Sequence, residues 1–393
     1  MRPRILGLGF GFLLLIQGVV NGGEAWPMYR GSTDLRGCVE GKLSDQPHLR
    51  WRFETEGAVR SSVAIVDGLA LFGSGDEKVY ALSLKDGKPV WSFTADGEIE
   101  ASPLVVDGRV YIGTANGTMY ALDLKSGEKV WTFSAEDQIL GAANLVRLGA
   151  EQKPHLVFGS YDYYLYCVDA ADGKLRWKFE TENFINGAPS VSGNRVVFGG
   201  CDGLLHVISA ETGLEVLKIE VGSYVPGSVA IDGSTGYVGH YGERVQAIDL
   251  EKGVIVWEYK DREFPYFSTP AVGKKFVVIG GRDKRVHAIR KADGKQAWTF
   301  QARRSVDGSP IIVGDRVAVG ADDGFLYVLD LETGSLAWQY ETGRGMRPKP
   351  QAVGQIGQDR IPVCGRGYPV RRQLHRGIEE DAGRADLQLP DLR

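Results

Sequence analysis

Hydrophobic and polar residues alternate in short runs along most of this chain, and glycine-rich turns separate the runs. In residues 119–133, Tyr120 and Leu122 alternate with Ala121 and Asp123, which is the two-residue period of a β-strand. Gly127 follows and suits a tight turn, because glycine takes a positive φ without steric cost. Residues 130–133 return as a second run, so the pattern predicts two antiparallel strands joined by a turn.

This pattern recurs at a nearly fixed spacing of 40 residues, with one interval of 46 and one of 41. The copies are 79–93, 119–133, 165–179, 205–219, 245–259, 286–300 and 326–340. Each copy has a turn glycine: Gly87, Gly127, Gly173, Gly213, Gly253, Gly294 and Gly334. A tryptophan recurs at Trp51, Trp91, Trp131, Trp177, Trp257, Trp298 and Trp338, with Leu217 in the fourth copy. A fixed period of this size indicates a repeat architecture.

Each repeat also carries two earlier strands. In the second repeat these are residues 101–106 and 109–113, joined by Asp107 and Gly108. Four strands and a period near 40 residues are typical of a β-propeller blade. A Gly-x-x-Asp or Gly-x-x-Asn turn recurs after the second strand, and we interpret its polar side chain as a cap of its own turn.

The predicted fold is therefore all-β: an eight-bladed propeller of four-stranded antiparallel blades. Seven blades come from the full repeats. The eighth would begin at the C-terminus, in residues 346–365, and would be completed by an N-terminal outer strand, residues 49–53, which contains Trp51. Such strand exchange would leave no open sheet edge.

The two ends of the chain are predicted to lie outside the blades. Residues 1–25 have the pattern of a signal peptide, with Arg2 and Arg4 before an apolar run and small residues at Gly23 and Ala25. We therefore expect an exported protein, periplasmic or extracellular, with no transmembrane span once the signal is removed. A retained N-terminal anchor is the alternative.

Four regions follow: a signal peptide (1–25), a lead-in segment laid over one face of the ring (26–48), the propeller (49–365) and an atypical tail (366–393). The tail is rich in arginine and lacks the repeat. A back-translation with permitted codons, read one nucleotide forward, restores the missing strand and turn. We hypothesise a frameshift after Gly365, and sequencing of the DNA would decide it.

Composition and residue spacing limit the kinds of binding site and catalytic site that we expect. Lys and Arg number 46 and Asp and Glu number 50, a net charge of −4, which gives no general attraction to nucleic acid. The four cysteines, Cys38, Cys167, Cys201 and Cys364, have no metal-ligand spacing, and no disulfide is predicted. His206 and His287 take the strand position of Tyr120, so we interpret them as core residues, while His240 stands alone in a loop. No metal site and no catalytic residue is predicted.

The best candidate site is the mouth of the central channel, where each innermost strand begins. One aligned column there is apolar and should pack between blades: Val59, Ile99, Ile139, Ile185, Val225, Tyr266, Val306 and Met346. By strand alternation the next column faces the channel: Arg60, Glu100, Leu140, Asn186, Pro226, Phe267, Asp307 and Arg347. Its ionic arc (Asp307, Arg347, Arg60, Glu100) lies opposite a mainly apolar arc.

This mouth has two interpretations. Arg60, Glu100, Asn186, Phe267, Asp307 and Arg347 could bind a ligand or peptide that has both a charged and an apolar part. Alternatively, the charged residues form salt bridges that only fix neighbouring blades.

The repeat Tyr-Ala-Leu-Asp-x-x-x-Gly-x-x-x-Trp resembles that of the pyrroloquinoline-quinone (PQQ)-like propeller family. The resemblance covers residues 49 to about 365. The family includes quinoprotein alcohol dehydrogenases, which bind the quinone and Ca²⁺ at the ring centre. It also includes a non-catalytic lipoprotein of the outer-membrane barrel-assembly machinery, and sensor domains fused to kinases. This chain lacks the adjacent cysteines and the long inserts of the dehydrogenases.

The resemblance therefore implies a monomeric, non-catalytic interaction or scaffold module with a protein partner in the cell envelope, and no cofactor is expected. Two alternatives stay open. One is a small quinone-binding protein or oxidoreductase that uses PQQ and calcium. The other is a carbohydrate or polymer binder that uses Tyr161, Tyr163 and Tyr164.

Overall fold

The computed structural model describes residues 10–11, 25–44, 47 and 49–342. Its contacts divide the chain into two units, 1–356 and 357–393. The second unit lies outside the described residues. Most of the predicted signal peptide, the predicted eighth blade and the atypical tail also lie outside them. The description that follows concerns the first unit alone.

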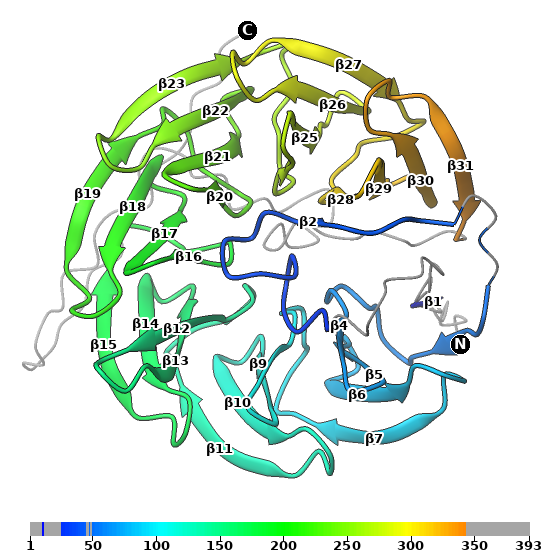
Figure 1. Cartoon of the computed structure of the whole chain (residues 1–393). Helices are drawn as coiled ribbons and strands as arrows, with labels where there is room; N and C mark the ends of the chain where they lie inside the picture. Colours follow the sequence, from blue (N-terminus) through cyan, green and yellow to red (C-terminus); the bar gives the residue numbers. More distant parts are fainter. Residues whose placement is uncertain (1–9, 12–24, 45–46, 48, 343–393) are drawn as a thin grey trace, which may run out of the picture. The chain divides into compact units, whose positions relative to one another are not determined.

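Seven sheets in the described part of this unit each contain four antiparallel strands that are consecutive in sequence, and the last of them has β2 as a fifth, parallel strand (Figure 1). Blade 1 is β4 (Ala64–Val66), β5 (Leu69–Gly73), β6 (Lys78–Ser83) and β7 (Pro89–Thr94). Blade 2 is β8 (Leu104–Val106), β9 (Arg109–Gly113), β10 (Thr118–Asp123) and β11 (Lys129–Ser134). Blade 3 is β12 (Asn144–Leu148), β13 (Lys153–Gly159), β14 (Tyr164–Asp169) and β15 (Leu175–Glu180). Blade 4 is β16 (Ser190–Ser192), β17 (Arg195–Gly199), β18 (Leu204–Ser209) and β19 (Glu215–Glu220).

The remaining blades repeat this arrangement. Blade 5 is β20 (Ala230–Asp232), β21 (Thr235–His240), β22 (Arg244–Asp249) and β23 (Val254–Tyr259). Blade 6 is β24 (Ala271–Val272), β25 (Phe276–Gly280), β26 (Arg285–Arg290) and β27 (Gln296–Gln301). Blade 7 is β28 (Ile311–Val313), β29 (Arg316–Gly320), β30 (Phe325–Asp330) and β31 (Leu336–Glu341).

The prediction of eight blades was wrong, because the structure is a seven-bladed propeller. The predicted eighth blade rested on a return strand (49–53) and a partial repeat after Met346, and neither carries the four-strand pattern. An N-terminal strand does join the last described blade, as predicted, but it is not residues 49–53. The N-terminal strand that joins the last blade is β2 (Cys38–Val39), which pairs in parallel with β28, whereas β3 (Phe53–Glu54) pairs with β1 (Phe10–Gly11).

The recurring tryptophan covers the joint between consecutive blades. Trp91, on β7, donates its indole N–H to the carbonyl of Leu124 in blade 2, at 2.9 Å. Its ring lies on the turn glycine, since a Cβ placed on Gly127 would lie 2.6 Å from it. The φ of Gly127 is +72°, which disfavours any other residue. This contact explains why the glycine and the tryptophan recur together.

The same indole bond recurs around the propeller. It joins Trp51 to Leu84, Trp131 to Ala170, Trp177 to Ala210, Trp257 to Lys291 and Trp298 to Leu331. Trp338 of the last blade donates instead to the carbonyl of Ser44, at 3.1 Å. The N-terminal segment thus takes the place of a blade turn beside blade 7.

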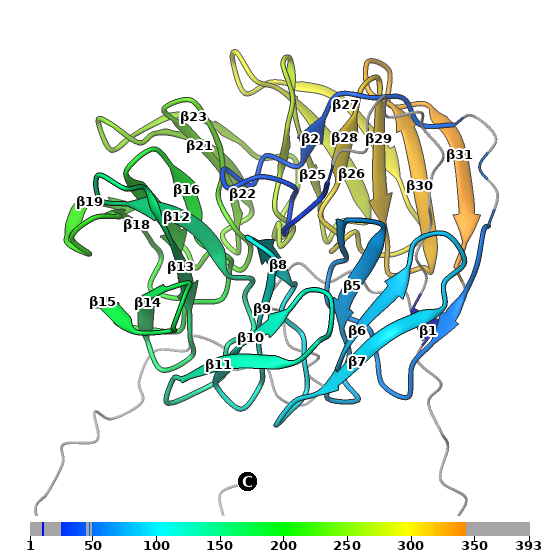
Figure 2. The ribbon, with the colours of Figure 1, turned by 60° about the horizontal axis from the view of Figure 1, so that its bottom comes forward.

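Residues 26–39, here called the hub segment, cross one face of the blades and touch every innermost strand (Figures 1 and 2). In six blades the same N–H of the innermost strand donates to a hub carbonyl. The pairs are Ile65 to Trp26, Val105 to Pro27, Val191 to Thr33, Ile231 to Asp34, Val272 to Arg36 and Ile312 to Gly37. In blade 3 the side chain of Asn144 donates to Thr33 instead, at 2.8 Å.

Two hub side chains lie among the innermost strands. The guanidinium of Arg30 donates to the carbonyls of Pro310 and Pro270, at 2.5 and 2.8 Å. Burial lowers its pKa to about 10, so it stays charged at neutral pH. The Tyr29 hydroxyl donates to Thr269 Oγ1 at 3.1 Å. The hub segment therefore closes this end of the ring centre with several buried polar contacts, while Arg30 Nε has no hydrogen-bond partner among the described residues.

No helix among the described residues has the length and apolar character needed to span a membrane.

Candidate functional site

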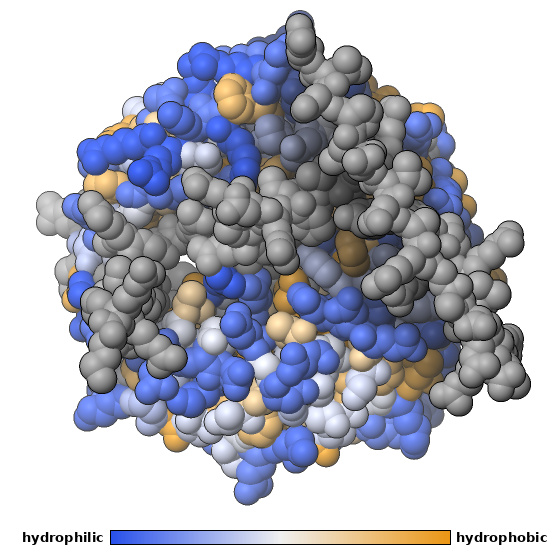
Figure 3. Space-filling model, turned by 180° about the vertical axis from the view of Figure 1, so that it is seen from behind, coloured by the Kyte–Doolittle hydropathy of each residue, from blue (hydrophilic) through white to orange (hydrophobic). Residues whose placement is uncertain are grey.

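The candidate channel-mouth residues in the described part of the chain lie in the loops that enter each blade. Each precedes its innermost strand, whereas the hub bonds come at the strand itself. A backbone bond in each blade ties this entry loop to the turn between the second and third strands. Examples are Ala115 to Glu98 in blade 2 and Tyr241 to Tyr224 in blade 5. The loops and turns of all seven blades thus lie at the same end of the strands, here called the mouth face. Figure 3 views the molecule from the side opposite to that of Figure 1, and the described surface seen there is mostly hydrophilic with scattered hydrophobic residues.

The predicted apolar column packs between blades. Ile99, Ile139, Ile185, Val225 and Val306 are fully or almost fully buried. Each meets a glycine at the end of the second strand of the preceding blade: a Cβ on Gly199 would lie 2.7 Å from Val225, and one on Gly239 would lie 2.7 Å from Tyr266. Close backbone approach therefore fixes the position of the next column, which includes the candidate residues.

Arg60 and Glu100 come together at the mouth, as an ion pair between blades 1 and 2. Their side chains are 17% and 12% exposed, so solvent screens the pair less than it would a surface pair. Arg347, the predicted neighbour of Arg60, lies outside the described residues.

Asp307 pairs with a residue that the sequence reasoning missed. Arg282, in the turn after β25, donates through Nε and Nη2 to the two carboxylate oxygens of Asp307, at 3.2 and 2.8 Å. This bidentate pair joins blades 6 and 7. Arg282 could have been found from the recurring Gly-x-x-Asp turn, since Gly280 and Asp283 place it beside the entry loop of its own blade.

Phe267 lies under the same arginine. The Arg282 guanidinium carbon is 4.2 Å from the centre of the Phe267 ring, a cation–π distance. The other side of Phe267 stacks on Tyr241, with ring centres 5.7 Å apart, and Tyr241 stacks on Tyr224 at 4.3 Å. These residues form an aromatic stack that runs from blade 5 to the Arg282–Asp307 pair.

The other predicted mouth residues are separate from this stack. Asn186 is buried and donates its amide to Cys201 Sγ at 3.0 Å. Leu140 is buried. A second aromatic group lies at blades 3 and 4, where Tyr161 and Tyr163 contact Phe184, with ring centres 4.9 and 5.2 Å apart. The third tyrosine of the carbohydrate hypothesis, Tyr164, instead lies under the Lys178 ammonium, at 3.9 Å.

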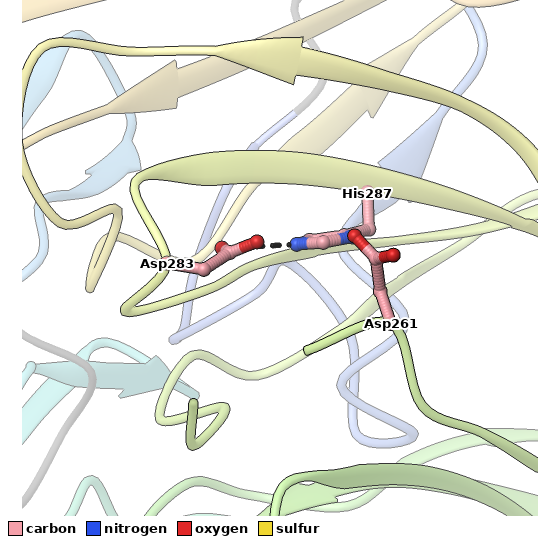
Figure 4. Close-up of side chains that lie close together, drawn as sticks. All are labelled: Asp261, Asp283 and His287. Carbon is pink, nitrogen blue, oxygen red and sulfur yellow. Dashed lines mark hydrogen bonds and ion pairs between the residues drawn. The ribbon is translucent and has the colours of Figure 1, made fainter. Parts of the chain in front are cut away.

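One cluster among the described residues has ligand types that suit a metal: Asp261, Asp283 and His287 (Figure 4). His287 Nε2 lies 3.1 Å from Asp283 Oδ1, and Nδ1 lies 3.1 Å from the Tyr259 hydroxyl. Both ring nitrogens are thus engaged. Asp261 pairs with Arg285 at 3.4 Å. A metal ion would have to displace these bonds inside a site where His287 is fully buried.

The repeat supplies a structural explanation for this cluster. In other blades the turn aspartate accepts a hydrogen bond from a tyrosine four residues later: Asp76 from Tyr80, Asp162 from Tyr166 and Asp323 from Tyr327, at 2.7–2.8 Å. His287 takes the tyrosine position in blade 6, and His206 does so in blade 4, where it faces Asp202 at 2.8 Å. The pair therefore caps a turn from within the core.

Among the described residues, Cys38, Cys167 and Cys201 form no disulfide with one another. Burial raises the pKa of Cys167 to about 12, so this thiol is not a nucleophile at neutral pH.

Known proteins resemble this chain in sequence and in fold. A stretch of 106 residues is 29% identical to an outer membrane protein assembly factor BamB from Marinobacter adhaerens, and it covers 26% of each chain. The alignment thus spans about a quarter of that relative. The crystal structure of BamB from Moraxella catarrhalis matches with a TM-score of 0.62 and 20% identity, over 72% of this chain and 85% of that one.

The quinohemoprotein alcohol dehydrogenase ADHIIG of Pseudomonas putida HK5 matches with a TM-score of 0.69 and 15% identity, over 82% of this chain and 73% of that one. At these identities the two structures show the shared fold alone. The family model described as outer membrane protein assembly factor BamB matches residues 44–160, 162–270 and 267–361. Because these matches cover more than half of the sequence, the chain belongs to the BamB-like family of PQQ-type β-propellers, which is related to the quinohemoprotein alcohol dehydrogenases.

Proposed function

We propose that this chain is an exported, non-catalytic interaction module of the cell envelope, which binds a protein partner through its mouth face. Membership of a family described as an outer membrane assembly factor supports this proposal. The predicted signal sequence in residues 1–25 supports export.

The exposed aromatic side chains of the mouth face carry the proposal. Tyr163, Tyr241 and Phe264 are 40%, 42% and 47% exposed, and they lie on the turns and entry loops of blades 3, 5 and 6. Aromatic side chains within a polar rim are enriched in protein interfaces, because they bury a large area at a small entropic cost. Of the three, Tyr241 is restrained by stacking on Tyr224 and Phe267, and Tyr163 contacts Phe184.

The pairing of the mouth cations favours a protein partner over a quinone. A tricarboxylate ligand such as pyrroloquinoline quinone needs fixed cations. Arg60 is paired with Glu100 and Arg282 with Asp307, so each would have to leave a carboxylate to bind such a ligand. The oxidoreductase alternative therefore draws less support from this geometry.

Capture from the envelope fraction after mild crosslinking tests the proposal. The wild-type chain should retain a defined partner, and the triple variant Tyr163→Ser, Tyr241→Ser, Phe264→Ser should lose it, because the exposed aromatic area is gone. Val90→Ser with Leu336→Ser is the matched control, since both side chains are exposed on outer strands away from the mouth.

Two results would contradict the proposal. One is equal capture by the wild type and the triple variant. The other is saturable binding of pyrroloquinoline quinone with Ca²⁺ that Arg60→Ala abolishes, which would favour the oxidoreductase alternative. A glycan array with the same variants tests the carbohydrate alternative.

A further inference from the structure

The joint between blades 4 and 5 lacks the tryptophan that covers the other described joints. Leu217 stands in its place on β19. At the six joints that have both residues, a Cβ placed on the turn glycine would lie 2.5–2.8 Å from the indole ring. At Gly253 the nearest atom would be 3.7 Å away, on Ile219, and Leu217 would be 3.9 Å away. This turn is therefore in ordinary van der Waals contact with Ile219 and Leu217, and it lacks the closer indole cover of its equivalents.

A hydrogen-bond acceptor also loses its donor at this joint. The carbonyl of Leu250 is the equivalent of those of Leu124 and Ala210, which accept the indole N–H of Trp91 and Trp177 at 2.9 and 2.8 Å. Leu217 has no N–H to offer. Leu250 is itself buried, so satisfying its carbonyl has energetic value.

A groove of about 450 Å³ lies beside the same joint. Its apolar lining includes Val216 of the outer strand, Ile231 and Leu250, and Arg195 and Glu251 stand at its polar side. A second groove, of about 550 Å³, lies between blades 3 and 4, where Trp177 is present, and its lining includes no outer-strand residue and not Ala210. The first groove includes Val216 and Leu250 but not Leu217 or Gly253, so it lies next to the turn that lacks an indole and not over it.

Apolar side chains surround this position on the outside of the blades. Leu214 and Val216 lie at the start of β19, and Val254, Ile255 and Val256 lie at the start of β23; all five are at least 39% exposed. Some outer strands carry a charge or a proline at their start, such as Lys129 in blade 2, Pro89 in blade 1 and Glu215 on β19 itself. Such residues discourage contacts at a sheet edge; on β23 the first such charge, Glu258, comes only after Trp257.

We propose that this joint is a binding site for the indole side chain of a tryptophan on the partner protein. The six intact joints define the occupant, because each shows an indole lying on a turn glycine and donating to the equivalent carbonyl. The partner's tryptophan would cover Gly253, donate to the Leu250 carbonyl and pack against the five exposed apolar side chains. This inference deepens the proposed function and rests on it for the source of the tryptophan.

Titration with N-acetyl-5-fluorotryptophanamide, followed by ¹⁹F NMR, tests the site directly. The full-length protein should bind this probe saturably. Leu217→Trp should abolish binding, because the repeat's own indole then fills the joint. The phenylalanine analogue, which lacks the N–H, should compete about fivefold more weakly, as expected for one lost hydrogen bond. Equal binding by wild type and Leu217→Trp, or no binding by wild type, would overturn the proposal.

Two controls keep the result specific. The thermal unfolding midpoint of Leu217→Trp should equal or exceed that of the wild type, since tryptophan is the residue of the other joints. Conversely, Trp177→Leu removes the indole at the joint between blades 3 and 4, and it should create a second probe site. A Trp177→Leu variant that is folded but binds no additional probe would contradict the claim that loss of the indole at a joint creates a binding site.

Capture from the envelope separates this inference from the proposed function. Partner capture by the wild type that Leu217→Trp abolishes supports both. If Leu217→Trp captures the partner as well as the wild type does, the indole site is not the contact, although the module still binds its partner. If neither chain captures a partner, the proposed function fails, while the probe titration still decides whether an indole site exists.

Discussion

At the scale of single residues, His206 is the buried group with the clearest dependence on pH. Its two ring nitrogens lie 2.8 Å from Asp202 and 2.6 Å from Glu215. Burial lowers the pKa of His206, but the hydrogen bonds and charges of the two carboxylates outweigh burial, and the net pKa is raised above 6.5. The charged imidazole is thus favoured in the folded state.

This raised pKa predicts stability that is present at acidic pH and lost at higher pH. Below pH 6.5 the imidazole is charged in both states, so the two ion pairs contribute fully. As pH rises through the raised pKa of the folded state, the proton is lost and the contribution disappears. The unfolding free energy of the wild type minus that of His206→Tyr, measured in urea between pH 5.5 and 8.5, should show this decrease. The difference is needed because burial lowers the pKa of His240 to about 4, which makes both chains more stable as pH rises.

His206→Tyr is the matched control, because tyrosine is the residue of blades 1, 3 and 7 and can still donate to Asp202. The variant should fold and should lose this part of the pH dependence. If its unfolding free energy changes with pH as steeply as that of the wild type, His206 is not the titrating group.

Arg30 is a residue whose role is structural although its side chain is charged. Its guanidinium donates hydrogen bonds to two backbone carbonyls, those of Pro310 and Pro270. Arg30→Ala should leave both carbonyls without their donor and open a cavity, at a cost of about 2–4 kcal/mol in unfolding free energy. Arg36→Ala, on the same segment but with a part-exposed side chain, is the control and should cost less than about 1 kcal/mol. Equal effects in denaturant unfolding would contradict a special role for Arg30.

At the scale of the blade, the turn glycine serves two purposes that can be separated. Gly127 and Gly253 have nearly the same φ, +72° and +69°, so alanine imposes similar backbone strain at both, about 1 kcal/mol. Only Gly127 is covered by an indole, 2.6 Å from a placed Cβ. Gly127→Ala should therefore cost about 1–3 kcal/mol more than Gly253→Ala, because overpacking adds to the strain.

Thermal or urea unfolding of the two alanine variants checks this difference. Similar losses at both positions would show that the backbone conformation alone selects glycine. A larger loss at Gly253 would contradict the lack of close indole cover at the joint between blades 4 and 5.

The blade could be predicted from the sequence because its information is local and repeated. Strand alternation, the turn glycine and the tryptophan recur at a fixed interval, and the all-β propeller with four-stranded antiparallel blades follows from them. The proximity of Arg60 and Glu100 could be predicted because each occupies the same aligned position in neighbouring blades. Arg282 was missed because it approaches Asp307 from a turn, and the aligned column contained entry-loop residues alone.

At the scale of the whole molecule, the repeat pattern alone did not determine the number of blades. Residues 49–53 carry one strand's pattern and the stretch after Met346 carries a partial one, and nothing in either sequence fixes the strand with which it pairs. The strand that does join the last blade, β2, is two residues long. The hub contacts could not be predicted from the sequence either. Backbone carbonyls accept most of these hydrogen bonds, and every residue type has a backbone carbonyl.

The hub segment makes a prediction for the molecule as a unit. It accepts one N–H from the innermost strand of six blades and receives the Asn144 amide from the seventh. Removing residues 26–39 from the mature chain would expose those groups or leave them unpaired, at about 1–3 kcal/mol for each that stays buried. The loss summed over the blades approaches the total stability of an ordinary domain, about 5–15 kcal/mol. The shortened chain should therefore lose its near-ultraviolet circular dichroism or melt at a much lower temperature.

Adding the hub segment as a separate peptide tests whether its contacts stabilise the blades without a covalent link to them. A synthetic peptide of residues 25–44 should restore part of the thermal stability of the shortened chain, because its carbonyls meet the same N–H groups without the covalent link. A peptide carrying Arg30→Ala should restore less, since the Pro270 and Pro310 carbonyls then stay without their donor. A shortened chain that melts at the wild-type temperature would contradict this role, and the blades would then be held together by their tryptophan-covered joints alone.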